Sequence, residues 1–136
     1  MLQASCHCGN ISITINSKPA SLISCNCSIC LRLGALWGYF FPEDITINTK
    51  NNPPKAYQWG DKNIDFQHCP NCGCTTHYIP TKASGREKMA VNFRMVDKDT
   101  FEAIFEEKSG EINVRHFDGA DTWQFIEPAV PQQNLE

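Results

Sequence analysis

The sequence predicts a mainly β, antiparallel domain with one or two short helices. Short stretches rich in β-branched and aromatic residues alternate with clusters of Gly, Pro, Asn and Asp, which is typical of strands joined by turns. Eight cysteines fall mostly into three groups, so metal is expected to hold the fold together. A chain of 136 residues is most simply one domain. We place that domain at residues 1–130 and a C-terminal tail at residues 131–136.

The clearest strand signal lies at residues 11–15, where Ile alternates with Ser and Thr as on a half-buried strand. A helical turn is expected at residues 28–33, ending at Gly34. The spacing of Phe101, Ile104 and Phe105 predicts a second helix, with Asp97 or Asp99 as its N-cap. Further strands are predicted at residues 36–41, 45–47, 55–58, 64–66, 75–79, 88–93 and 111–117.

Charge and composition exclude several classes of partner. The formal charge of −3 provides no basic footprint for a phosphate backbone, so we expect no nucleic-acid partner. No run approaches the roughly 18 apolar residues of a membrane-spanning helix, so no membrane partner is expected. The first residues lack the basic stretch and apolar run of a secretory signal, and a reducing cytoplasm is therefore the expected location. There, cysteines hold metal more often than they form disulfides.

Two of the cysteine groups together supply a closed metal site. Cys69-Pro70-Asn71-Cys72-Gly73 has the spacing of a zinc knuckle, and Cys6 with Cys8 would complete a Cys₄ set. Zn–S bonds of about 2.3 Å in a tetrahedron require sulfurs about 3.8 Å apart, closer than residues i and i+2 of an extended strand. A Cys-x-Cys pair must therefore curl at its centre. The intervening residue, such as His7, then faces away from the metal.

The third group, Cys25-Asn26-Cys27-Ser28-Ile29-Cys30, supplies three further thiols. Cys74 is left over, and two interpretations of it remain open. Cys74 could complete a second closed site, which would make both metals structural. Alternatively, Cys74 is a small buried residue, and the fourth position of the second metal is open to water or substrate.

A zinc ion with three thiolate ligands and one open position favours some reactions over others. Three thiolates donate more charge than three imidazoles, so such a zinc is a weaker generator of hydroxide, although it can still hold a thiolate or polarise a carbonyl. Zinc deaminases place a glutamate two residues after a ligand, and no glutamate in this chain has that position. A sulfur-containing substrate is therefore the best match.

At these residues the chain resembles the glutathione-dependent formaldehyde-activating enzyme family, which has a zinc-bearing, Mss4-like β fold. The matching segments cover most of the chain from Ser5 to Trp123. They are Ser5-Cys6-His7-Cys8-Gly9, Cys25-Asn26-Cys27-Ser28-Ile29-Cys30, Gly34-Ala35, Phe66-Gln67-His68-Cys69-Pro70-Asn71-Cys72-Gly73-Cys74, Val91-Asn92-Phe93-Arg94 and Phe117-Asp118-Gly119.

The resemblance implies a carbon–sulfur lyase that combines formaldehyde with glutathione into S-hydroxymethylglutathione. It implies two Zn²⁺ ions per chain. The structural ion would be held by Cys6, Cys8, Cys69 and Cys72, and the catalytic ion by Cys25, Cys27 and Cys30. The chain departs from the family at Leu31, where a basic residue is frequent.

Glutathione carries two carboxylates, so cations are expected near the open site. Arg32 and Arg94 are the candidate substrate contacts, with Asn92 as a hydrogen-bonding partner; the alternative for each is a solvated charge or a turn stabiliser. We expect Asp118 and Trp123 to be turn and packing residues. Three aromatic residues are expected in the core rather than in a pocket wall: Trp37, Tyr39 and Phe40.

A second function is also compatible with the sequence, namely a zinc-stabilised, non-catalytic binding or chaperone-like module. Such a module predicts two closed metal sites and an exposed apolar patch. The enzyme instead predicts one closed site and one open site.

Overall fold

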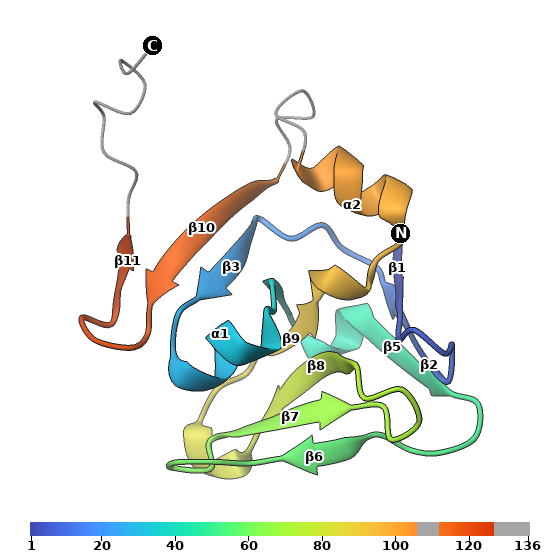
Figure 1. The fold of residues 1–136 in the computed structure, drawn as a ribbon, viewed down its shortest axis with the longest axis horizontal. Coiled ribbons are helices and arrows are strands. Elements are labelled where there is room, and N and C mark those ends of the chain that lie inside the picture. The colour runs from blue at the N-terminus through green and yellow to red at the C-terminus, as the bar shows by residue number, and fades with distance from the viewer. Residues whose placement is uncertain (106–111, 127–136) are drawn as a thin grey trace.

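The computed structural model describes residues 1–105 and 112–126, whose strands form two sheets (Figure 1). The smaller, antiparallel sheet has the order β1-β2-β5. Its strands are β1 (Leu2–Ser5), β2 (Ile11–Ile15) and β5 (Ile45–Thr49). The alternation predicted at residues 11–15 is confirmed, because Ile11, Ile13 and Ile15 are buried and Ser12 and Thr14 are not.

The larger sheet has the order β11-β10-β3-β4-β9-β8-β7-β6. Its strands are β3 (Ser21–Cys25), β4 (Trp37–Phe40), β6 (Lys55–Tyr57), β7 (Ile64–His68), β8 (Thr75–Pro80), β9 (Met89–Asn92), β10 (Asn113–Asp118) and β11 (Gln124–Ile126). Strand β10 pairs with β3 in parallel, and the other described pairs are antiparallel. The mainly β, antiparallel class is therefore confirmed, with one parallel pair that the sequence pattern did not reveal.

Both predicted helices are present. Helix α1 (Ser28–Leu33) ends at Gly34, whose left-handed φ of 62° suits a residue without a Cβ. Helix α2 (Lys98–Phe105) is capped by Asp97, whose carboxylate accepts a hydrogen bond from the Thr100 amide at 2.7 Å. Three short 3₁₀ turns complete the described elements: η1 (Pro42–Asp44), η2 (Lys82–Ser84) and η3 (Phe93–Met95).

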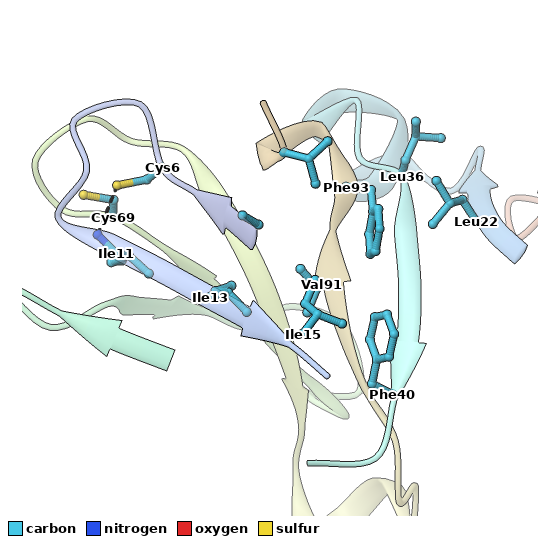
Figure 2. Close-up of a cluster of buried hydrophobic side chains, with 12 residues drawn as sticks. Cys6, Ile11, Ile13, Ile15, Leu22, Leu36, Phe40, Cys69, Val91 and Phe93 are labelled. Carbon is cyan, nitrogen blue, oxygen red and sulfur yellow. Dashed lines mark hydrogen bonds between the residues drawn. The ribbon is translucent and has the colours of Figure 1, made fainter. Parts of the chain in front are cut away.

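The main core lies between the two sheets. Figure 2 shows Ile13 and Ile15 of β2 facing Val91 of β9 and Phe40 of β4, with Leu22 and Leu36 further along. The side chains of Phe40 and Phe93 stack at 6.0 Å. At the other end of β2, Cys6 and Cys69 meet beside Ile11, although they lie far apart in the sequence (Figure 2). Cys6 and Cys69, two of the predicted ligands of the closed metal site, therefore lie at one end of this core.

A second buried cluster lies on the opposite face of the larger sheet. Because side chains alternate along a strand, Leu22 enters the main core while Ile23 faces the other side, and Leu36 and Trp37 divide in the same way. This second cluster contains Ile23, Cys30, Ala35, Trp37, Phe66, Tyr78 and Ala90. It includes one of the predicted metal ligands, so this face positions the second cysteine group.

The predicted boundary at residue 130 and the tail after it lie outside the described residues. Within residues 1–105 and 112–126, none of the helices combines the length and apolarity needed to cross a membrane.

Gly38 of β4 leaves room for the Phe93 ring. A Cβ at this position would lie 2.6 Å from Phe93 Cε1, and both residues are buried. We predict that Gly38→Ala lowers the free energy of unfolding by about 1–3 kcal/mol, because the ring must move within a packed core. Chemical denaturation would measure the change, and Thr46→Ala on an exposed position of β5 is the control. A variant as stable as the parent would contradict this packing.

His77 is buried on β8, and its burial lowers the pKa of the imidazole to about 4 from an ordinary 6.5. The unfolded chain therefore binds a proton between pH 6.5 and 4 that the folded chain does not bind. The contribution of His77 to the free energy of unfolding is therefore complete at neutral pH and is lost as the pH falls through that window. We predict that the stability difference between the parent and His77→Gln narrows by about 1 kcal/mol per pH unit there. Urea titrations from pH 7 to 5 test this, and parallel pH profiles would contradict it.

Candidate functional site

The first cysteine group brings together Cys6, Cys8, Cys69 and Cys72, whose sulfurs lie within 4.8 Å of one another. The Cys6 and Cys8 sulfurs are 3.7 Å apart, and the Cys8 and Cys69 sulfurs are 3.6 Å apart. These separations are close to the 3.8 Å or so that a tetrahedral Zn–S₄ site requires. The four residues therefore fit a closed zinc site.

Backbone amides around these four sulfurs favour the thiolate form that a cation binds. Gly9 and Gly73 follow the two cysteine pairs with left-handed φ values of 82° and 80°, which turns amides towards sulfur. The Ile11 amide donates to Cys6 Sγ at 3.2 Å. Burial opposes ionisation of Cys72, but amides of neighbouring residues lower the pKa of its thiol to about 5. The pairing of β7 with β8 shifts register at Gln67 and His68, immediately before the knuckle.

Cys74 belongs to neither metal group among the described residues. It is partly buried, packs against the main core, and accepts a hydrogen bond from Cys69 N through its carbonyl oxygen at 2.9 Å. The interpretation in which Cys74 completes the second site is therefore not supported, because Cys74 adjoins the first group. His7 is exposed and outside the group, as the curl of Cys-x-Cys requires.

The second group consists of Cys25, Cys27 and Cys30, whose sulfurs also lie within 4.8 Å of one another. Cys25 ends β3, Cys27 precedes α1, and Cys30 is the third residue of that helix. Within the described residues, the group contains no fourth His, Cys, Asp or Glu. The trio therefore fits a metal ion with three protein ligands.

Two contacts hold the trio in place from outside. The indole Nε1–H of Trp37 donates to Cys30 Sγ at 3.3 Å, which favours a thiolate at this buried position. Gly119 passes so close that a Cβ there would lie 2.6 Å from Cys25 Sγ and 3.3 Å from Cys27 Cβ. A residue without a side chain is therefore needed at this position.

The three thiols cannot all ionise side by side without a cation. A hydrogen bond from Cys30 lowers the pKa of the Cys25 thiol to about 5. The same contact, together with burial, raises the pKa of Cys30 above its ordinary range. One proton is thus kept between neighbouring sulfurs, and a divalent cation could replace it.

The loop that carries Gly119 is fixed by a network around Asp118. The Asp118 carboxylate accepts hydrogen bonds from the amides of Asp121 and Thr122, at 3.2 and 3.1 Å. The Ala120 amide donates to Asn26 Oδ1 at 3.1 Å, which ties the loop to the residue between the first two thiols. The turn role predicted for Asp118 is therefore confirmed, and Asn26 faces this loop.

A cavity of about 690 Å³ opens beside the trio, and all three of its cysteines line it. None of the four residues of the first group does. Eight of the 21 lining residues are aromatic, and the Trp37 ring contacts Tyr78 edge-on at 4.9 Å and Phe66 at 6.0 Å between centroids. The cavity size falls within the range of small-molecule sites. The two metal groups thus differ, because the three thiols of the second group line this cavity and the four thiols of the first group do not.

The predicted core residues divide between core and cavity. Phe40 is in the main core, as expected. Trp37 is buried but also lines the cavity, and Tyr39 lines it with 36% of its surface exposed. Trp123 contacts Phe117 edge-on at 5.1 Å but is 63% exposed, so it lies in the cavity wall and not in the core.

None of the three predicted substrate contacts lines the cavity. Arg32 donates to the Ser28 carbonyl oxygen of its own helix at 2.9 Å. Asn92 is buried and accepts hydrogen bonds from the Leu36 and Arg94 amides, at 3.2 and 3.1 Å.

Arg94 donates through Nε to the Gly34 carbonyl oxygen at 3.1 Å, and its guanidinium lies 5.2 Å from the Phe101 ring centroid. The positions of Arg32, Asn92 and Arg94 support structural roles, and their contact with substrate remains an untested prediction. The cation that does line the cavity is Arg86, which follows the turn η2. The sequence pattern did not reveal it, because only the folded sheet brings Arg86 to the cavity that Cys30 also lines.

Comparison with known proteins shows the family and the fold of this chain. The model of the glutathione-dependent formaldehyde-activating enzyme family matches residues 1–112. A crystal structure of a Rhodobacter sphaeroides protein has a TM-score of 0.63 and 23% identity, and the match covers 83% of this chain and 99% of that chain. That likeness shows a shared fold. No curated protein matched the chain.

Gly119 provides a direct test of the second group. We predict that Gly119→Ala removes the metal from this group while the first group keeps its own, because the added methyl displaces Cys25 Sγ. The measurement is the metal content per chain after purification in zinc, with the unfolding transition recorded in parallel. Ala120→Ser in the same exposed loop is the control. Full metal content in Gly119→Ala would contradict the assignment.

Proposed function

The chain belongs to the glutathione-dependent formaldehyde-activating enzyme family, and on that premise we propose that it is a zinc-dependent carbon–sulfur lyase. The reaction joins formaldehyde or another small aldehyde to glutathione or a related thiol, giving an S-hydroxymethylglutathione-type adduct. The observation that carries the proposal is the three-thiol group that opens onto the cavity. A group closed by four protein ligands would serve stability alone.

The proposal assigns two Zn²⁺ ions per chain. Cys6, Cys8, Cys69 and Cys72 would hold a structural ion, and Cys25, Cys27 and Cys30 a catalytic one. When bound at the trio, zinc would supply Lewis-acid polarisation of the aldehyde oxygen or a lowered pKa for the substrate thiol. Both uses need a position that the protein leaves unfilled.

The chain's own residues would orient the reactants and exclude water. Trp37 fixes Cys30 through its indole N–H, and the Asp118 loop fixes Cys25 through the close approach of Gly119. The hydroxyls of Tyr39 and Tyr78 interact near the thiols, and burial raises the pKa of both phenols, so they stay protonated. A protonated phenol in the cavity wall can donate a hydrogen bond to an aldehyde oxygen.

Metal binding by these thiols requires a reducing compartment, and we propose a cytoplasmic location on that ground. All eight cysteines are free of disulfides, and seven of them lie in the two metal groups. Such thiols bind metal only while they remain reduced. A binding module with two closed metal sites is less consistent with the structure, because the described residues provide no fourth ligand to the trio.

Cysteine substitutions separate the two groups. We predict that Cys30→Ser leaves a folded chain with one zinc and no acceleration of adduct formation between glutathione and formaldehyde. Cys72→Ser should instead prevent stable folding, because a structural zinc contributes about 10–16 kcal/mol against a domain stability of about 5–15 kcal/mol. Cys74→Ser, outside both groups, is the control and should keep both metals.

Exchange-detected NMR of the glutathione–formaldehyde equilibrium measures the rate, and circular dichroism reports folding. Unchanged rates in Cys30→Ser would refute the catalytic assignment. A folded, active Cys72→Ser would refute the structural one.

A further inference from the structure

The cavity beside the trio is far more apolar than glutathione and formaldehyde require. All three tryptophans of the chain, Trp37, Trp59 and Trp123, line it. Among the described residues of the lining, Asp61 and Arg86 are the ones with charged side chains. Glutathione carries two carboxylates and one ammonium, and formaldehyde has no apolar group, so these reactants leave most of the wall without a matching surface.

The aromatic wall begins directly at the thiols. Trp37 bonds Cys30 Sγ through Nε1, and its ring contacts Tyr78 and Phe66, which contact each other at 5.7 Å. Any group attached to the reacting carbon would therefore meet aromatic rings. Offset and edge-on contacts with such rings favour aromatic or branched apolar partners.

The two charged residues of the lining lie on two loops around the same cavity. Arg86 follows η2, and its side chain interacts with the Tyr78 hydroxyl. Asp61 lies in the turn between β6 and β7. One cation and one anion suit a carboxylate and an ammonium, which is the pair that the amino-acid end of a glutathione-like thiol presents.

We propose that the aldehyde partner carries an aromatic or branched apolar group, which packs along the aromatic lining that begins at Trp37 and includes the half-exposed ring of Trp59, while a thiol carboxylate binds Arg86. This inference rests on the proposed function and narrows its substrate class. In the reaction, the thiol sulfur forms a bond to the carbonyl carbon, the C=O π bond breaks, and the thiol proton moves to the oxygen. The product is a hemithioacetal, with no change of oxidation state.

The test uses the zinc-loaded chain and three stable probes: S-methylglutathione, S-benzylglutathione and benzyl methyl sulfide. Binding is followed by tryptophan fluorescence, since all three indoles line the cavity, and by calorimetry. S-benzylglutathione should bind at least tenfold more tightly than S-methylglutathione, because a phenyl group is removed from water.

Two variants localise the effect. Trp59→Ala, on a side chain that is 45% exposed, should reduce the preference for S-benzylglutathione severalfold. Tyr57→Ala, 51% exposed and outside the lining, should leave it unchanged. Arg86→Met should weaken both glutathione probes about equally, and Lys88→Met, also outside the lining, should weaken neither.

The outcomes separate the two proposals. Equal affinity for the two glutathione probes would overturn the apolar substrate class and leave the lyase proposal standing. Binding of benzyl methyl sulfide without either glutathione probe would support the apolar site and refute the glutathione assignment. A preference unaffected by Trp59→Ala, or no binding of any probe, would overturn the inference.

Discussion

Crowding of sulfur is the constraint on which the rest of the structure depends. Seven thiols lie in two groups, in each of which the sulfurs are within 4.8 Å of one another, a spacing that is unfavourable for thiolates unless a cation lies between them. The first group joins the turn after β1 to the turn between β7 and β8, and so connects the two sheets. The second group joins the end of β3 to α1. A metal ion at the first group would therefore couple metal binding to folding, whereas the second group lies at the edge of a cluster that aromatic packing also holds.

The two faces of the larger sheet differ, because one packs in the main core and the other carries the second cysteine group and the cavity. Strand β4 shows this division, because Phe40 packs between the sheets while Trp37 faces the thiols and the cavity. Because side chains alternate along a strand, these two residues of β4 point to opposite faces of the sheet. Loops then complete the cavity: the Asp118 turn brings Gly119 and Trp123, and the loop before β9 brings Arg86.

Much of this arrangement could be predicted from local sequence. Cysteine spacing was enough to separate the two sets of thiols, because Cys-x-Cys and Cys-x-x-Cys geometry is short-range and tetrahedral distances are fixed. The strand at residues 11–15 and the cap at Asp97 also followed from local pattern. Strands β1, β3 and β11 were missed because they are short and lack alternating β-branched residues. The parallel pairing of β10 with β3 depends on contacts across about ninety residues, which no local pattern records.

The cavity could not be predicted for the same reason. Arg32 and Arg94 were chosen because they lie near the thiols or a matching motif in sequence, yet both bond backbone carbonyls and neither side chain lines the cavity. Arg86 comes to the cavity only through the pairing of β8 with β9. Similarly, Tyr39 was expected in the core because its neighbours are apolar, whereas the sheet's second face opens onto a cavity.

The central claim is that one metal is closed by four sulfurs and the other is held by three with a free position. Cadmium NMR of the chain loaded with two Cd²⁺ ions tests it most directly. The account predicts two resonances, of which one stays fixed on addition of a thiol and the other, lost in Cys30→Ser, moves. Two resonances whose chemical shifts both stay unchanged on addition of thiol, or a single resonance, would contradict it.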